Sequence, residues 1–138
     1  MRVNSVSNIV RVSYLLESFS SAATLLRVSS PLQVGRIPVG WAVVRGESMA
    51  PALAEGDRLL VRYGAAVRPG RVVVARFADG TIAVKRAVER RTTRTGEPAW
   101  WLLGDNPDGV DSRHRGPVAE ADVLGVAVAR VWPRPRPL

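Results

Sequence analysis

Short runs of β-branched and apolar residues, each ended by a glycine or proline turn, dominate the chain after Trp41 and limit what it can fold into. Pro69-Gly70 and Asp79-Gly80 are typical of tight connections between strands. Several short strands in succession favour a mostly β fold, either an antiparallel sheet or a partly closed barrel. We expect strands at residues 41–45, 57–63, 71–77, 81–90, 100–103 and 122–132, and polar loops at 91–99 and 104–116.

The two ends of the chain have a different composition. Residues 1–38 are rich in Ser and Val, and a weak amphipathic pattern at 10–28 predicts a weakly helical or disordered extension. The last six residues alternate Pro and Arg, which favours an extended, solvated tail. We therefore divide the chain into an N-terminal extension of unassigned role (1–38), one domain (39–132) and a Pro/Arg tail (133–138).

The composition excludes several classes of function. Cysteine is absent, which excludes disulfides, thiolate metal sites and cysteine nucleophiles. His114 is the one histidine, so a zinc peptidase helix with two histidines is excluded, and we expect no metal or cofactor. The net charge of +8 comes from scattered arginines, which favours a basic surface over a nucleic-acid site. Without an apolar stretch of about 20 residues, we expect no membrane anchor and a cytoplasmic location.

Lys85 is the one lysine beside nineteen arginines. An arginine cannot lose its proton in a protein, whereas burial can make a lysine neutral. On a strand at 81–90, Lys85 shares a face with Ala83 and Ala87, whose small side chains allow something to pack over the amine. A general base at neutral pH needs a pKa near 7, against about 10.4 for a free lysine. The alternative is a lysine whose stem packs while its head reaches water.

Ser48 lies in a second segment of interest, residues 46–57. It follows a predicted strand and Gly46, and it precedes Pro51, which can start a helical turn. Such a turn would expose the hydroxyl and direct backbone N–H groups toward it, where they could bind an oxyanion. Capping of a short helix is the alternative role of Ser48, and this segment alone favours that role.

A third segment, residues 104–118, carries three aspartates within seven residues: Asp105, Asp108 and Asp111. A calcium loop is disfavoured because Arg115 stands near the place of the required Glu. We expect a structural loop in which Asp111 pairs with Arg113 and Asp105 accepts backbone N–H groups. His114 is expected to be a surface residue of the same loop.

In this order, the three segments resemble the boxes of the type I signal peptidase family, which is similar in turn to the self-cleaving domain of LexA-type repressors. The matching patterns are G-x-S-M-x-P-x-L-x-x-G-D at 46–57, K-R at 85–86, and G-D-N followed by D-S-R at 104–113. The resemblance implies a signal peptidase/LexA-like serine peptidase with Ser48 as nucleophile, Lys85 as general base and the Ser48 backbone N–H as oxyanion donor. It also implies substrate-binding or structural roles for Gly46, Met49, Pro51, Gly104, Asp105, Asn106, Asp111, Ser112 and Arg113.

The chain resembles more specifically a shorter branch, the nickel-type superoxide dismutase maturation proteases, through the motifs at 61–64 and 101–107. This implies an endopeptidase that removes the N-terminal leader of the nickel superoxide dismutase precursor, with the substrate added as a strand along an open edge near 41–45. The alternatives are a general signal-peptidase-like leader peptidase, a LexA-like self-cleaving regulatory module and a non-catalytic nucleic-acid binder.

The chain departs from the family pattern at two places. Gly46 stands where signal peptidases often have a second hydroxyl oxyanion donor. Gly109 and Val110 stand where many relatives have a serine that contacts the lysine, which leaves Ser112 as the candidate to orient Lys85.

Overall fold

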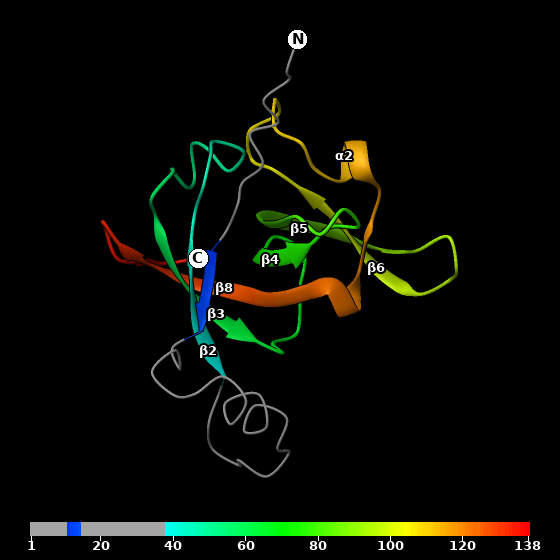
Figure 1. Ribbon diagram of the computed structural model, residues 1–138, viewed down its shortest axis with the longest axis horizontal. Helices are drawn as coiled ribbons and strands as arrows, with labels where there is room; N and C mark the ends of the chain where they lie inside the picture. The colour runs from blue at the N-terminus through cyan, green and yellow to red at the C-terminus, as the bar shows by residue number, and fades with distance from the viewer. Residues whose placement is uncertain (1–10, 15–37) are drawn as a thin grey trace.

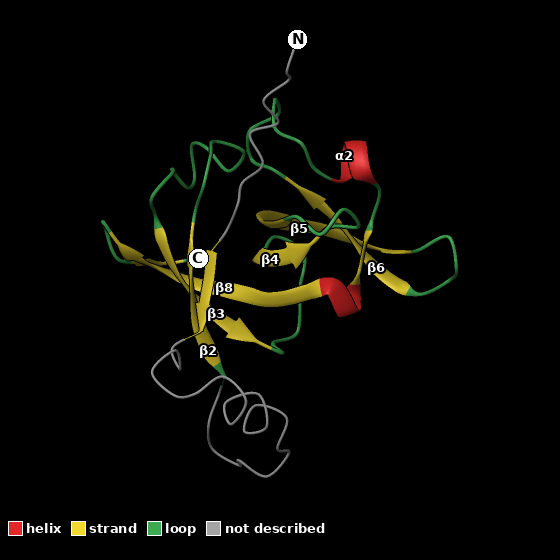
Figure 2. Cartoon of the chain, viewed as in Figure 1, coloured by secondary structure: helices red, strands yellow, loops and turns green. Residues whose placement is uncertain are grey.

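The computed structural model describes residues 11–14, as a strand, and residues 38–138. The described strands form one coiled antiparallel sheet in the shape of a half-barrel, in the order β1-β2-β3-β8-β4-β5-β6-β7, with β9 beside β8 (Figure 1). The described residues contain little helix (Figure 2), which confirms the mostly β prediction. The strands are β1 (Arg11–Tyr14), β2 (Val39–Val43), β3 (Arg58–Tyr63), β4 (Val72–Arg76), β5 (Ile82–Thr92), β6 (Pro98–Leu103), β7 (Val118–Ala119), β8 (Val123–Trp132) and β9 (Arg136–Pro137). Two short helical elements are α2 (Ser112–Arg115) and the 3-10 turn η1 (Glu120–Asp122).

The central strands are buried on both faces, so the described residues form two apolar clusters. The first four residues of β4 are buried, which accounts for the continuous apolar run of that strand. Strand β5 lies between the two clusters, because Val84 packs in the first and Ala83 and Ala87 pack in the second. The first cluster contains Ala42, Val44, Met49, Leu53, Leu59, Val61, Val72, Val74, Val84 and Ala127. The second contains Val73, Ala75, Phe77, Ala83, Ala87, Trp100, Leu102, Val118 and Val126.

The hairpin between β5 and β6 is longer than predicted, because residues expected in a polar loop at 91–99 continue both strands. Arg91 pairs with Ala99 and Thr92 with Pro98, which leaves only 93–97 as the loop. The Arg91 guanidinium lies 3.9 Å from the centroid of the Trp101 ring, a cation–π contact. The prediction failed here because the side chains of this hairpin are polar and face solvent, which gave the strand residues the pattern of a loop.

The predicted loop at 104–116 contains the single-turn helix α2. Asp111 is its N-cap and accepts a hydrogen bond from the Arg113 backbone N–H at 3.0 Å. His114 Nδ1 accepts the N–H of Asp111 at 3.4 Å, which completes a capping box. The His114 side chain is 55% exposed, in keeping with the predicted surface position.

The predicted helix at 10–28 is wrong for residues 11–14, which form β1, and the remaining residues of that prediction, 10 and 15–28, lie outside the described part of the chain. Strand β1 pairs antiparallel with β2, so the edge near 41–45 that we expected to be open is covered from Gly40 to Val43. A partner strand on a free edge outweighs a weak amphipathic pattern.

The C-terminal tail is largely exposed, as expected, but it turns back instead of extending away. Strand β9 pairs with β8, and the Arg136 guanidinium donates to the carbonyl of Ala52 at 2.7 Å. Leu138 packs against the first cluster. Within the described residues, no helix has the length and apolar character needed to span a membrane.

Candidate active site

Ser48 and Lys85, 37 residues apart in the sequence, are joined by a hydrogen bond of 2.6 Å between Lys85 Nζ and Ser48 Oγ. Ser48 comes from the turn after β2, and Lys85 from the first half of β5. Both residues are buried: Ser48 is 6% exposed and Lys85 is 2% exposed. Ala83 and Ala87, which we expected beside Lys85 on its face of the strand, are buried as well. The structure therefore brings together the two residues singled out in the sequence.

The environment of Lys85 favours the neutral amine. Burial lowers the pKa of Lys85 from 10.5 to about 8, because the charged form loses its hydration. The charge of Asp111 acts in the opposite direction, whereas Arg115 and Arg113 lower this pKa further. A lysine with such a pKa is substantially neutral in mildly alkaline solution, so it can accept a proton from a hydroxyl group.

The turn that carries Ser48 explains the glycine two positions before it. Gly46 is buried and has a φ of 73°, a left-handed conformation that glycine adopts without strain. A residue with a second hydroxyl would be strained in this backbone, which accounts for the first departure from the family pattern.

The segment after Ser48 forms successive turns and no helix, so Ser48 does not cap one and Pro51 does not start one. The Leu53 N–H donates to the Met49 carbonyl at 2.9 Å. Both of these side chains are fully buried in the first cluster, whereas Pro51 is exposed. Met49 thus acts as an anchor of the turn.

Asp57 fixes the far end of the same segment. Its carboxylate accepts the Ala54 N–H at 3.1 Å and forms an ion pair with Arg130 of β8 at 3.2 Å. Asp57 is 3% exposed, and its carbonyl accepts the Val44 N–H at 2.9 Å. The nucleophile segment is therefore held to the sheet at both ends.

The G-D-N loop lies directly on Ser48. The backbone N–H of Asn106 donates to the Ser48 carbonyl at 2.8 Å, and the Asn106 side-chain amide donates to the Glu47 carbonyl at 3.1 Å. A Cβ atom added to Gly104 would lie 2.5 Å from the Ser48 carbonyl oxygen, and one added to Gly109 would lie 2.8 Å from Ser48 Cβ. Only glycine at both positions permits this close contact. The second departure from the family pattern thus has a steric reason: Gly109 packs on the serine.

Arg86 holds this loop from the opposite face of β5. It forms a bidentate ion pair with Asp105, with Nε–Oδ1 and Nη2–Oδ2 distances of 2.7 and 2.6 Å, and its Nη1 donates to the Gly70 carbonyl at 2.8 Å. Asp105 therefore accepts from Arg86, where we had expected backbone N–H groups. Sequence reasoning assigned Arg86 no role, although its place next to Lys85 puts it on the other face of the strand.

Asp111 organises the remaining part of the third box. It is fully buried, and it accepts the Gly104 N–H at 2.8 Å and the Arg113 guanidinium at 2.9 Å, which confirms the predicted Asp111–Arg113 pair. Burial raises the pKa of Asp111, but hydrogen bonds from Arg113 and the Gly104 N–H outweigh it, so the net pKa is lowered and the carboxylate is ionised. The Ser112 hydroxyl accepts the Leu102 N–H at 3.0 Å, a structural contact in place of the predicted one to Lys85.

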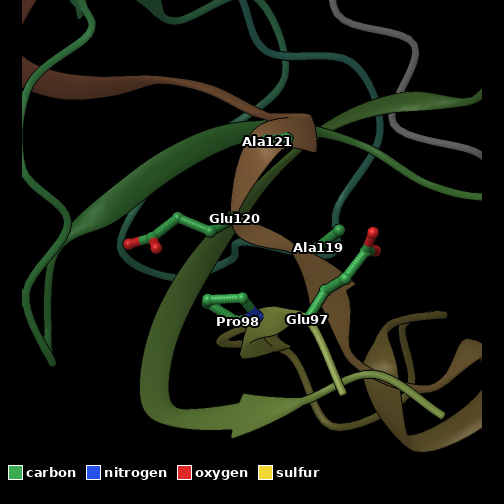
Figure 3. Close-up of a pocket in the computed structure, with 5 residues that line it drawn as sticks. All are labelled: Glu97, Pro98, Ala119, Glu120 and Ala121. Atoms are coloured by element: carbon green, nitrogen blue, oxygen red, sulfur yellow. The ribbon is translucent and has the colours of Figure 1, made fainter. Parts of the chain in front are cut away.

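A hollow elsewhere on the surface carries no comparable chemistry. It is lined by residues from the β6 and η1 region (Figure 3), and one of them, Glu120, forms an ion pair with Arg90 at 2.9 Å. In the part of the chain that the structure describes, no group of three His, Asp or Glu side chains is arranged to hold a metal ion. The lining residues of the hollow are Glu97, Pro98, Ala119, Glu120 and Ala121.

Comparison with known protein families identifies the family of the chain. The family model described as Peptidase S24-like matches residues 12–128, a range that begins within β1 and includes all three boxes. No curated protein matches the chain.

Proposed function

Because the chain belongs to the Peptidase S24-like family, which implies a serine peptidase, we propose that it is an endopeptidase with Ser48 as nucleophile and Lys85 as general base. The observation that carries this proposal is the 2.6 Å hydrogen bond between the two buried side chains. A nucleophile and a base within hydrogen-bond reach are the geometric requirement for covalent catalysis.

The proposed reaction has two steps. Neutral Lys85 accepts the proton of Ser48 while Oγ attacks the scissile carbonyl carbon, and the backbone N–H of Ser48 is our candidate donor to the oxyanion. The protonated lysine then gives its proton to the leaving amine, which departs as the peptide bond breaks. Water hydrolyses the acyl-enzyme with Lys85 again acting as base.

We place the substrate strand beside residues 82–85 of β5, in a revision of the edge expected near 41–45. These residues pair with β4 on one side, and pairing with β6 begins only at Arg86 opposite Leu103. Within the described chain, no strand occupies the other side of residues 82–85. An extended peptide added there would run directly to Lys85 and Ser48.

The substrate we propose is a precursor protein with an N-terminal leader, and specifically the nickel superoxide dismutase precursor. The support for this choice is the resemblance of residues 61–64 and 101–107 to the maturation proteases of that enzyme.

The test is co-expression of the chain with the dismutase precursor, followed by the intact mass of the precursor product. We expect a shortened product with wild type and with Ser112→Ala, and the full-length precursor with Ser48→Ala. Ser112 is the matched control because it is the one other serine in residues 38–138, and its hydroxyl contacts Leu102. A shortened product with purified, folded Ser48→Ala would overturn the assignment of the nucleophile.

A further inference from the structure

Arg115, the last residue of α2, reaches the turn between β4 and β5. Its Nη1 forms an ion pair with Oδ2 of Asp79 at 2.8 Å, and its guanidinium lies 5.3 Å from the centroid of the Phe77 ring. The Arg115 side chain is 22% exposed, against 61% for Arg90, which makes the same two kinds of contact elsewhere on the sheet. A largely buried guanidinium with two partners has a well-defined position.

Asp79 continues this contact into the strand that carries Lys85. Its Oδ1 accepts the Thr81 backbone N–H at 2.9 Å, so the two carboxylate oxygens are divided between the turn and Arg115. Thr81 directly precedes β5, and Lys85 follows four residues later. The ion pair therefore attaches the last residue of α2 to the start of the strand that holds the candidate base.

Arg115 and Lys85 lie on the same face of the sheet. Phe77, which Arg115 contacts, belongs to the second apolar cluster together with Ala83 and Ala87. These two alanines share a face of β5 with Lys85, because the side chains of a strand alternate in direction. The guanidinium is thus a permanent cation on the side of the sheet to which the Lys85 amine points.

We propose that Arg115 is a positioning residue for the general base: its attachment to Asp79 holds a fixed positive charge near Lys85, and this charge opposes protonation of the amine. The inference rests on the proposed function, since it is there that the neutral amine acts as a base. Arg115 lies outside the D-S-R pattern at 111–113, and the resemblance assigned it no role.

The charges that act on Lys85 belong to α2 and its N-cap. Burial has the largest effect on the pKa of Lys85, and the Asp111 carboxylate raises this pKa. Arg115 lowers it, and Arg113 lowers it to a lesser extent. Arg113 donates to both oxygens of Asp111, at 2.9 Å each, so these two charges largely offset each other at Lys85. Arg115 is paired instead with Asp79, whose side chain is 50% exposed and whose charge is screened by water.

The other described elements beside Lys85 present uncharged groups to it. Val73 of β4 lies opposite Lys85 in the strand pairing, and Ser48 contributes its hydroxyl. Arg86, next in sequence, points to the opposite face of β5. Arg115 is therefore the cation whose removal should change the protonation of Lys85 most.

The chain permits a direct measurement because Lys85 is its one lysine. In protein labelled with ¹³C at lysine Cε, a single NMR signal reports the protonation of the Lys85 amine as the pH is raised. We expect a midpoint of about 8 in wild type and a midpoint about half a pH unit higher in Arg115→Gln, because loss of a neighbouring cation favours the ammonium form. Arg90→Gln also loses an ion pair and a cation–π contact, and as the matched control it should titrate as wild type does.

The double variant Arg115→Glu/Asp79→Arg separates the charge of Arg115 from its attachment. An ion pair with exchanged charges preserves the link between α2 and the turn, but it places a negative charge near Lys85. We therefore expect its midpoint to lie above that of Arg115→Gln. A midpoint restored to the wild-type value would show that only the attachment matters and would overturn the proposal. Equal midpoints in wild type and Arg115→Gln would overturn it as well.

The kinetic consequence is measured with a synthetic peptide that spans the leader junction of the dismutase precursor, the leader-junction peptide. Because neutral Lys85 is the base, kcat/KM of Arg115→Gln at pH 7 should fall about threefold and should approach the wild-type value well above the midpoint. An equal loss at every pH would indicate a displaced site and contradict the role of the charge. If wild type fails to cleave the peptide while the NMR midpoints still differ, the proposed substrate is wrong and the effect of Arg115 on Lys85 stands.

Discussion

Strand β5 presents two adjacent cationic residues on opposite faces, and they have opposite surroundings. Lys85 is 2% exposed, and none of the ion pairs found in the described residues includes it. The Arg86 side chain is 34% exposed and is paired with both oxygens of Asp105. Burial without a contacting carboxylate lowers the pKa of Lys85 and makes it a base, whereas a bidentate carboxylate makes Arg86 a fixed support. The Asp105 carboxylate thus makes Arg86 a positioning residue, whereas Lys85, which no carboxylate contacts, can act as a base.

Lys85→Arg has the largest expected effect, because it gives both faces of β5 a permanent cation. Because arginine stays protonated, the variant cannot accept the Ser48 proton, and we expect kcat/KM to fall by about 10³-fold or more. The measurement is the initial rate of cleavage of the leader-junction peptide, with circular dichroism to check the fold. A folded Lys85→Arg protein that cleaves at the wild-type rate would show that Lys85 is not the base.

The pH profile tests the same difference without a substitution. The neutral form of Lys85 is the active one, and its pKa is lowered to about 8. Below that pH the protonated fraction grows, so kcat/KM should fall about tenfold for each pH unit and level off above it. An activity that stays constant between pH 6 and pH 8, or that rises as the pH falls, would contradict a lysine base.

Gly109→Ala tests the contact that the loop makes with the nucleophile. The added Cβ would lie 2.8 Å from Ser48 Cβ, so either the serine or the loop must shift. Displacement of a reacting group by less than 1 Å can cost about ten- to a hundredfold in rate, and we expect kcat to fall within that range. Asp108→Ala, in the same loop but exposed, is the control and should keep most of the activity. Higher activity in Gly109→Ser would instead show that a hydroxyl at this position assists Lys85.

Arg86→Gln, matched with Arg90→Gln on the same strand, has the smallest expected effect. Arg86 anchors the loop through Asp105, whereas the Arg90–Glu120 pair is exposed and remote from Ser48. We expect a several-fold loss of kcat and a loss of about 1 kcal/mol of stability for Arg86→Gln, and little change for Arg90→Gln. Rates and urea denaturation measure the two effects. Equal losses in both variants would show that Arg86 supports the site no more than the remote Arg90 does.

Much of the site was predictable because its chemistry depends on residue type and order. The order of the three boxes implied the Ser48–Lys85 pair, and the spacing of Asp111 and Arg113 predicted their ion pair; the structure contains both contacts. The strands at 57–63, 71–77 and 81–90 were predictable as well, since their β-branched residues end at clear turns.

The remaining features depend on spatial contacts that a pattern does not encode. The sequence alone does not reveal that Gly104 and Gly109 lie against Ser48, because a glycine needed for close packing looks the same as one needed for a turn. The residues of β1 were predicted as helix because the partner strand, β2, is separated from them by residues 15–37 in the sequence, and pairing at a sheet edge is a tertiary property. The role of Arg86 was not predictable from the sequence, because it depends on where the G-D-N loop with Asp105 lies in the folded chain.

The close seating of the G-D-N loop on Ser48 has a consequence for how this chain can vary. The two loop positions that touch the serine tolerate no side chain, but Asp108 and Val110 between and beside them are exposed. Mutation can therefore change the charge or bulk at the rim of the site while the glycines keep the catalytic distances unchanged. Selectivity for different polypeptides can evolve at that rim without any loss of the underlying reactivity.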